Sequence, residues 1–390
     1  MQGRETPPRL TIVLPLKGRH LFTLRFLWHA NKARLPYRFL IADGQVNEAV
    51  AHYLENSQRL FPNLDIEYVR YPNDTDYSQF FAKMSDTLQR VSTPYAMMAS
   101  NDDFLGFNGI ERALDFLDAN SDYVAARGRP TAFWVYSGLG NPGAGIHGRF
   151  NGFRMDYECE DVSASEVAAR LRQGGLSILI YYAVYRTDAL TTICREDVEI
   201  DFSDPVLHET YHAMRTLTLG KVRTNKATIT YYSQIGTSMT TDPSRDWVRH
   251  LLRSRLTSEV QDFIKRISSA AIAAGADEAA IDEQVRTLIE SHFRNFLSMN
   301  YGPVMQAKRI IRKKWPDSVK YWQSRPRFSV GRKCAGVISK LANAGASEED
   351  LKRTRGELDQ ISAALSGEAF TDYAGPFSGM LRADGSRTWL

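Results

Sequence analysis

Two adjacent carboxylates, Asp102 and Asp103, end an apolar run in the stretch YAMMASNDDFLGF, residues 95 to 107. Two like charges side by side repel each other and lose solvation when buried, so a fold keeps them mainly to hold a cation or to cap a helix. A helical pattern follows at residues 109 to 119, and Asn108 suits its N-cap. A cap at Asn108 leaves both carboxylates unexplained, which favours a ligand-binding site.

A second stretch that could do chemistry is HETYH, residues 208 to 212, which matches the zinc-binding pattern H-E-x-x-H. In that pattern His208 and His212 bind zinc and Glu209 activates water. The HxxGxxH extension is missing, and the next glutamate along the chain is Glu259, so no third ligand lies in the expected register. A zinc hydrolase therefore stays open only as an alternative.

The first hundred residues alternate between strand and helix patterns, which predicts βαβ units and a parallel sheet. In such a sheet, ligands bind beyond the carboxyl ends of the strands. The polar residues 17 to 19, 43 to 44 and 101 to 103 follow three of these strands and should meet at one edge. We expect strands at 10–16, 37–44, 64–71 and 94–100, and helices at 20–33, 47–60 and 78–91.

The rest of the chain divides into an irregular middle and a helical end. The glycine-rich segment 138–152 suits either a loop that folds over a ligand or a plain connection. We expect strands at 176–190 and 226–235, with a helix after Asp204-Pro205 between them. Patterns at 247–268, 277–299 and 347–365 predict helices. These patterns predict two domains, residues 1–238 and a mostly helical region 239–390.

Composition limits the class of protein. The 390 residues are 43% hydrophobic, and a net charge of +4 from 49 basic and 45 acidic residues is too balanced for nucleic-acid binding by the whole surface. Cys159, Cys194 and Cys334 form no CxxC pair, which argues for reduced thiols and against a cysteine metal site. The N-terminal residues carry no secretory signal, and the longest apolar stretch, 177–185, is too short to span a bilayer. We expect a cytoplasmic protein.

The segment 307–333 interleaves lysines and arginines with tryptophan, tyrosine and phenylalanine. Three interpretations stay open: a solvated helix face, a peripheral contact with the anionic inner face of the membrane, and, least favoured, single-stranded nucleic acid. The C-terminal helices also offer an interface for oligomerisation.

The motifs together resemble the GT-A glycosyltransferases, in a bacterial group related to the large inverting glycosyltransferase family 2. The resemblance covers roughly residues 9 to 235 and rests on five stretches in order: TIVLPLKGR, FLIADG, FFAKMSDTLQRVSTPYAMMASNDDF, YYAVYRTDAL and HETYHAMRTLTLGKV. It implies a GT-A fold, an α/β Rossmann-like mixed, mostly parallel sheet flanked by helices, here with a helical C-terminal extension.

The resemblance also implies a metal site at the acidic motif. The family usually has Asp-x-Asp or Asp-Asp-Asp there, whereas this chain has Asn101 first. Asp103 is then the expected metal ligand with Asp102 beside it, and Asn101 is a weaker oxygen ligand or a ribose contact. Hard oxygen ligands and phosphates suit Mn²⁺ or Mg²⁺.

By the same resemblance, the donor nucleotide lies against the first two strands. Asp43-Gly44 is also a common strand-exit turn, and Lys83 is also explained as a solvated helix residue. The resemblance implies that the nucleotide is framed by Pro15, Lys17, Gly18 and Arg19. It implies that Asp43, with Gly44, contacts the base or ribose and that Lys83 lies near the base or phosphates.

Glu209 is implied as the catalytic base, because it opens a helix that ends in the family's Arg-x-x-x-x-Gly pattern at Arg215 and Gly220. Asp201 and Asp204 are reserve candidates, and a retaining mechanism would leave Glu209 without this role.

The expected function is inverting, metal-assisted transfer of a sugar from a nucleotide-sugar donor to a glycan, lipid-linked or protein acceptor in bacterial polysaccharide biosynthesis. The alternatives are the zinc hydrolase and a non-catalytic sugar-nucleotide-binding protein.

Overall fold

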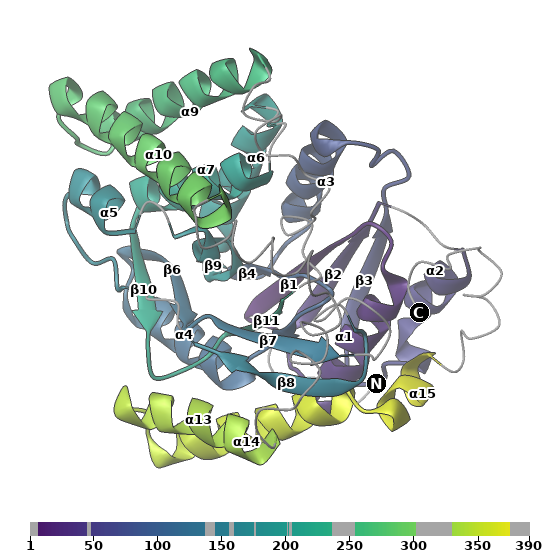
Figure 1. Ribbon diagram of the computed structural model, residues 1–390. Coiled ribbons are helices and arrows are strands. Elements are labelled where there is room, and N and C mark those ends of the chain that lie inside the picture. Colours follow the sequence, from purple (N-terminus) through teal and green to yellow (C-terminus); the bar gives the residue numbers. More distant parts are fainter. Residues whose placement is uncertain are drawn as a thin grey trace.

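The computed structural model describes residues 7–44, 48–136, 145–155, 160–174, 177–200, 202, 205–235, 254–301 and 330–374. These residues form a seven-stranded sheet and a four-stranded sheet with helices packed around them (Figure 1). The predicted fold class, a mixed and mostly parallel sheet flanked by helices, is confirmed.

The seven-stranded sheet has the order β10-β6-β9-β4-β1-β2-β3. Strand β9 runs antiparallel to both of its neighbours, β4 and β6, and the other neighbouring strands are parallel. The strands are β1 Leu10–Leu16, β2 Arg38–Asp43, β3 Asp65–Arg70, β4 Tyr95–Met98, β6 Tyr123–Gly128, β9 Val184–Arg186 and β10 Lys221–Asn225.

The predicted strands and helices of the first hundred residues are present with small shifts at their ends. Strand β1 is a run of residues buried almost throughout, as expected for a strand covered on both faces. The helices of this half are α1 His20–Lys32, α2 Glu48–Glu55, α3 Tyr77–Gln89, α4 Phe107–Ala119, α5 Val167–Gly174, α6 Thr187–Ile200 and α7 Pro205–Leu219, with 3₁₀ turns η1 Ser57–Arg59 and η2 Ile178–Tyr182.

Three local predictions are wrong. Of the strand expected at 176–190, only β9 is a strand, and it lies between η2 and the start of α6. Of the strand expected at 226–235, only 231–234 is one, whereas 221–225 forms β10. Helix α4 begins at Phe107 after Gly106, so Asn108 is not its N-cap. A continuous apolar run does not distinguish strand from buried helix, which explains the first error.

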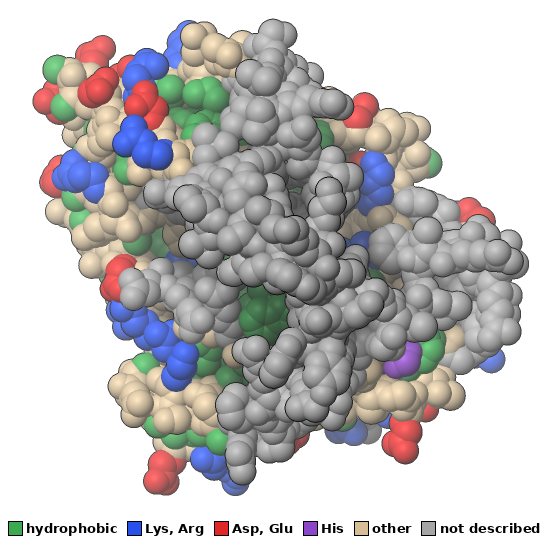
Figure 2. Space-filling view, viewed as in Figure 1, with side chains coloured by type: hydrophobic (Ala, Val, Ile, Leu, Met, Phe, Trp, Pro, Cys, Tyr) green, Lys and Arg blue, Asp and Glu red, His purple; other side chains and the backbone are tan. Residues whose placement is uncertain are grey.

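The four-stranded sheet has the order β5-β11-β7-β8 and lies beside the acidic motif. Strand β5 follows Asp103 directly and pairs antiparallel with β11. Residues 149 to 152 of the glycine-rich segment belong to β8. Figure 2, drawn in the view of Figure 1, shows hydrophobic side chains near its middle. The strands are β5 Phe104–Leu105, β7 Thr131–Tyr136, β8 Arg149–Arg154 and β11 Tyr231–Gln234.

The C-terminal helices pack on two opposite parts of the α/β core (Figure 1). Helices α9 and α10 share a buried cluster with α6 and α7, and α13 and α14 share one with the four-stranded sheet. The predicted boundary near 238 and the basic segment up to residue 329 lie outside the described residues and stay predictions. None of the described helices is long and apolar enough to cross a membrane. The helices are α9 Ser254–Ala273, α10 Glu278–Tyr301, α13 Val330–Asn343, α14 Glu348–Ala364 and α15 Gly367–Ala374.

Two helical glycines give a matched test of packing. A Cβ at Gly109 in α4 would collide with the backbone of Ile229, whereas a Cβ at Gly356 in α14 would meet nothing within 4 Å. We expect Gly109→Ala to cost about 1–3 kcal/mol in the free energy of unfolding. Gly356→Ala should instead add about 0.5–1 kcal/mol. Urea unfolding followed by circular dichroism measures both, and equal effects would contradict the packing of α4 on this segment.

The docking of α14 should depend on pH through Glu357. Its carboxylate accepts hydrogen bonds from the Asn108 N–H at 2.7 Å and the Tyr232 hydroxyl at 3.1 Å, and burial raises its pKa to about 7. Because the unfolded carboxyl titrates lower, the folded state binds more protons between about pH 4.5 and 7, and stability falls as pH rises through that window, by about 3 kcal/mol.

Glu357→Gln should remove this fall, since the amide does not titrate. Glu348→Gln, at an exposed position of the same helix, should keep it. Unfolding free energies from pH 4.5 to 8 measure the difference, and parallel curves for wild type and Glu357→Gln would contradict the assignment.

Candidate active site

The structure brings the three predicted polar segments to one edge of the seven-stranded sheet. Leu16 at the end of β1 is in register with Asp43 at the end of β2, and the Gly44 N–H donates to the Leu16 carbonyl at 2.9 Å. On the other side of β1, the Ala99 N–H donates to the Val13 carbonyl at 2.9 Å. The loops that follow β1, β2 and β4 therefore leave the sheet next to one another.

Asp103 is a buried carboxylate held by the four-stranded sheet. It is 3% exposed, and it accepts hydrogen bonds from the Tyr231 hydroxyl and from the Gln234 N–H, the latter at 2.6 Å. Burial raises the pKa of Asp103 well above its usual range, and the charge of Asp102 raises it further. Among the described residues no Lys, Arg or His forms an ion pair with Asp103, and its predicted role as a metal ligand stays a prediction.

Asp102 has a cationic partner. Its Oδ2 lies 2.8 Å from an Arg19 guanidinium nitrogen, and its Oδ1 accepts a hydrogen bond from the Ser100 hydroxyl. The Arg19 guanidinium also lies over the Phe22 ring at 4.6 Å. Arg19 therefore ties the loop after β1 to the acidic motif.

Arg25 lies beneath the acidic motif, fully buried in α1. Its guanidinium donates to the backbone carbonyls of Asp102 and, at 2.8 Å, of Ile146, and it packs over the Phe22 and Phe104 rings. Burial lowers the pKa of Arg25 to about 10, which leaves it charged at neutral pH. Its positive field favours the ionised form of Asp103.

The loop between β1 and α1 has an unusual backbone. Gly18 and Arg19 have φ values of 70° and 58°, in the left-handed region, and Arg19 precedes α1 without a side-chain cap. The Asn101 side-chain amide donates to the Arg19 carbonyl at 3.3 Å and to the Thr23 hydroxyl at 3.1 Å. In this structure Asn101 therefore holds the loop, while its predicted ribose or metal contact stays a prediction.

A second charged group lies at the end of β2. Lys83 is buried and donates to the Leu16 carbonyl at 3.1 Å and to Asp74 at 2.5 Å. The Lys17 ammonium lies 3.8 Å from the same Asp74 carboxylate, and the Lys17 side chain is 47% exposed. A Cβ at Gly44 would collide with Asp74, so the glycine lets this carboxylate reach the edge. Lys83 is thus no solvated helix residue.

Asp43 is almost fully buried at the same edge, and its Oδ2 accepts a hydrogen bond from the Tyr68 hydroxyl at 2.7 Å. Pro15, still within β1, is in register with Ala42. Both residues therefore lie near the carboxyl edge of the sheet, and their predicted contacts with a nucleotide stay predictions.

A stacked tyrosine pair connects the acidic motif with Glu209. Tyr182 stacks on Tyr231 with ring centroids 4.5 Å apart and an interplanar angle of 12°. Burial raises the pKa of Tyr182, and the negative charges of Glu209, Asp103 and Asp102 raise it further. The carboxylate of Glu209, on α7, therefore lies within electrostatic reach of the same tyrosine as the acidic motif.

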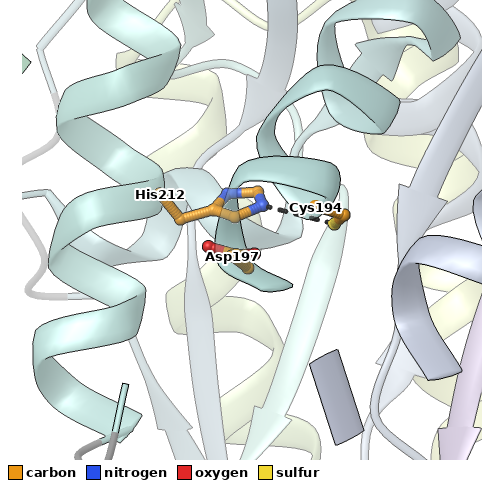
Figure 3. A group of neighbouring side chains, drawn as sticks. All are labelled: Cys194, Asp197 and His212. Carbon is orange, nitrogen blue, oxygen red and sulfur yellow. Dashed lines mark hydrogen bonds between the residues drawn. The ribbon is translucent and has the colours of Figure 1, made fainter. Parts of the chain in front are cut away.

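The two histidines of HETYH have other neighbours. His208 Nε2 lies 3.0 Å from Asp197 Oδ2, and His212 Nε2 lies 4.0 Å from Cys194 Sγ (Figure 3). Both histidines are buried, whereas Glu209 is partly exposed. The histidines thus lie next to Asp197 and Cys194. Burial raises the pKa of Tyr181 and the charge of Glu209 raises it further, and the Tyr181 ring lies 5.8 and 4.8 Å from the His208 and His212 rings.

The rest of that motif is structural. Arg215 donates to Glu196 through two nitrogens, at 2.7 and 2.8 Å. A Cβ at Gly220 would press on Val124 at 2.6 Å, so the glycine allows α7 to end against β6. The reserve candidates Asp201 and Asp204 lie outside the described residues.

Sequence reasoning missed Arg25, Asp74, Tyr182, Tyr231 and Gln234. Arg25 had a signal, because it stands on the apolar face of the predicted helix between Phe22 and Phe26. The others had none, since their importance depends on which segments meet in space.

In the comparison with known proteins, the similar chains are solved structures. No protein-family model and no curated protein matches the chain. Among solved structures, S. aureus TarS 1-349 is 12% identical, with a TM-score of 0.47 over 92% of this chain and 90% of its own. Its complex with UDP-GlcNAc is also 12% identical, with a TM-score of 0.44 over the same shares of both chains.

The mannosyltransferase PcManGT from Pyrobaculum calidifontis, in complex with GDP-Man and Mn²⁺, is 12% identical with a TM-score of 0.38 over 99% of this chain and 88% of its own. At these identities and TM-scores, the function of this chain has to be argued from its own residues.

The Tyr231 hydroxyl should contribute more to the free energy of unfolding than the hydroxyl of Tyr182, on which the Tyr231 ring stacks. It donates to Asp103 and accepts the Ser100 N–H at 3.1 Å, whereas the Tyr182 hydroxyl has no hydrogen-bond partner among the described residues. Tyr231→Phe should therefore lower the free energy of unfolding by about 1–3 kcal/mol. Tyr182→Phe should change it by less than about 0.5 kcal/mol.

Urea unfolding of the two variants at neutral pH measures this difference. An equal loss in both would contradict the hydrogen bonds assigned to Tyr231.

Proposed function

We propose that the chain is a nucleotide-sugar glycosyltransferase whose donor binds at the carboxyl edge of β1, β2 and β4. One observation carries the proposal: Tyr231 donates to the buried Asp103, and Tyr182, stacked on Tyr231, feels the negative charges of both Asp103 and Glu209. A proposed cation site and a candidate proton acceptor thus lie within electrostatic reach of one tyrosine.

The donor's diphosphate would meet the loop between β1 and α1. Helix α1 begins there without a side-chain cap, so its first amides can donate to an anion. Lys17 adds a half-exposed positive charge beside the loop. Asp43, with Tyr68, would contact the nucleoside, and Lys83 would hold Asp74 beneath it.

The acidic motif fits a divalent cation. Asp102 and Asp103 offer neighbouring carboxylate oxygens, and Asp103 has no described cation as partner. Mn²⁺ or Mg²⁺ suits such oxygen ligands. A cation bound there would neutralise the charge that develops on the leaving diphosphate. Arg19, which now pairs with Asp102, would compete for that carboxylate or move towards the phosphates.

Glu209 is the proposed general base of an inverting transfer. An acceptor hydroxyl attacks the anomeric carbon opposite the nucleotide, and a carboxylate within hydrogen-bond reach takes its proton. The partly exposed Tyr182, which stacks on the buried Tyr231, would offer the sugar an aromatic contact near this carboxylate. The acceptor is proposed to be a glycan, a lipid-linked glycan or a protein.

Calorimetry with UDP, GDP, CMP and their sugars, with and without Mn²⁺, tests the donor site. We expect one nucleotide to bind with Mn²⁺ and to stabilise the fold by about 2.7 kcal/mol at a hundredfold excess over its Kd. Asp103→Asn should abolish the metal-dependent part, whereas Asp115→Asn, at a carboxylate 60% exposed on α4, should keep it.

Glu209→Gln separates binding from chemistry. It should bind the donor as the wild type does, while donor hydrolysis and transfer fall by about 10²–10⁴-fold. Binding of no nucleotide would overturn the donor site. Donor binding with wild-type turnover in Glu209→Gln would overturn the role of Glu209, and donor binding without turnover in the wild type would favour a non-catalytic binding protein.

A further inference from the structure

Helices α6 and α7 bury three metal-binding side chains away from the acidic motif. Cys194, Asp197 and His212 each offer one ligand atom, and these atoms all lie within 4.8 Å of one another (Figure 3). Cys194 and Asp197 are three residues apart on α6 and so share a face of that helix, while His212 comes from α7.

The spacing of these atoms is close to that of a zinc site. Sγ of Cys194 and Nε2 of His212 are 4.0 Å apart. Zinc–sulfur and zinc–nitrogen bonds at a tetrahedral angle place the two atoms about 3.6 Å apart. For this pair of atoms, a movement of about 0.4 Å would reach the spacing of a zinc site.

Two polar atoms of the cluster are buried without a hydrogen-bond partner in the described part of the chain, Asp197 Oδ1 and His212 Nδ1; an ion bound by His212 Nε2 would satisfy only Asp197 Oδ1. Asp197 is 2% exposed and His212 is fully buried. Each such atom costs about 1–3 kcal/mol when nothing satisfies it. His208 already holds Oδ2 of Asp197, so Oδ1 is left to face a ligand.

The donor set selects the ion. A thiolate, an imidazole and a carboxylate suit Zn²⁺, whereas Mn²⁺ and Mg²⁺ prefer sites made of oxygen, such as Asp102 and Asp103. The spacing Cys-x-x-Asp on α6 takes the place of the CxxC pair that the sequence lacks. The lack of a CxxC pair argued against a cysteine metal site, but it does not exclude a site in which one cysteine is joined by an aspartate and a histidine.

We propose that Cys194, Asp197 and His212 bind a structural Zn²⁺ that joins α6 to α7. Binding displaces the thiol proton to solvent, and His208 holds Asp197 in place through its Oδ2. The Tyr181 and Tyr185 rings lie 4.8 and 5.9 Å from the His212 ring and surround the site with apolar surface. A water would take the fourth tetrahedral position on the ion. Glu209 has no part in it, which separates this site from a hydrolytic one.

Metal analysis of the full chain tests this proposal. Protein produced with added zinc, then treated with EDTA and gel-filtered, should keep one zinc ion per chain. Cys334→Ser, at the other described cysteine, and Glu209→Gln should keep the same content. Cys194→Ser and His212→Gln should lose at least tenfold in zinc content.

A spectroscopic test on the wild type does not depend on whether the variants fold. Protein produced with cobalt should show a thiolate-to-cobalt charge-transfer band, and the band should be unchanged in Cys334→Ser. Wild-type protein without bound zinc and without this band would overturn the proposal, as would full zinc content in a folded Cys194→Ser. Loss of zinc in Glu209→Gln would point to the H-E-x-x-H site instead. None of these results depends on nucleotide binding.

Discussion

The site depends on one costly group, the buried carboxylate of Asp103. Burial and the neighbouring Asp102 disfavour its charge, and the Tyr231 hydroxyl, the Gln234 N–H and the field of Arg25 oppose that effect. These partners come from β11 and α1, so both sheets and the first helix must be in place before Asp103 is held. The second sheet is thus part of the site as well as of the core.

Two other acidic side chains at the edge of the seven-stranded sheet, unlike Asp103, form ion pairs. Asp102 pairs with Arg19, and Asp74 pairs with Lys83 while Lys17 stays half-exposed. Asp103 alone of these acids has no described ion pair, which is the electrostatic reason to expect a cation there. The Cys194 cluster lies between other helices and has softer ligands, so the two proposed sites would take different metals.

The sequence supports most of the fold but less of the site. The strand and helix periods over residues 10 to 100 are strong because β1, β2 and β4 are buried and the helices between them are amphipathic. Prediction failed at 176–190, where burial on all sides hides the period, and at β10, a short alternating strand at the sheet edge. Tyr231 and Asp103 are 128 residues apart, and no local pattern connects them.

A crystal structure of the chain with Mn²⁺ and the nucleoside diphosphate that binds best, with anomalous data at the manganese edge, tests the central claim most directly. The account predicts a manganese peak at the Asp103 carboxylate in contact with the diphosphate, with the Glu209 carboxylate facing the space beyond the phosphates. Manganese bound elsewhere, or a nucleotide bound while Asp103 still bonds only to Tyr231 and Gln234, would contradict it.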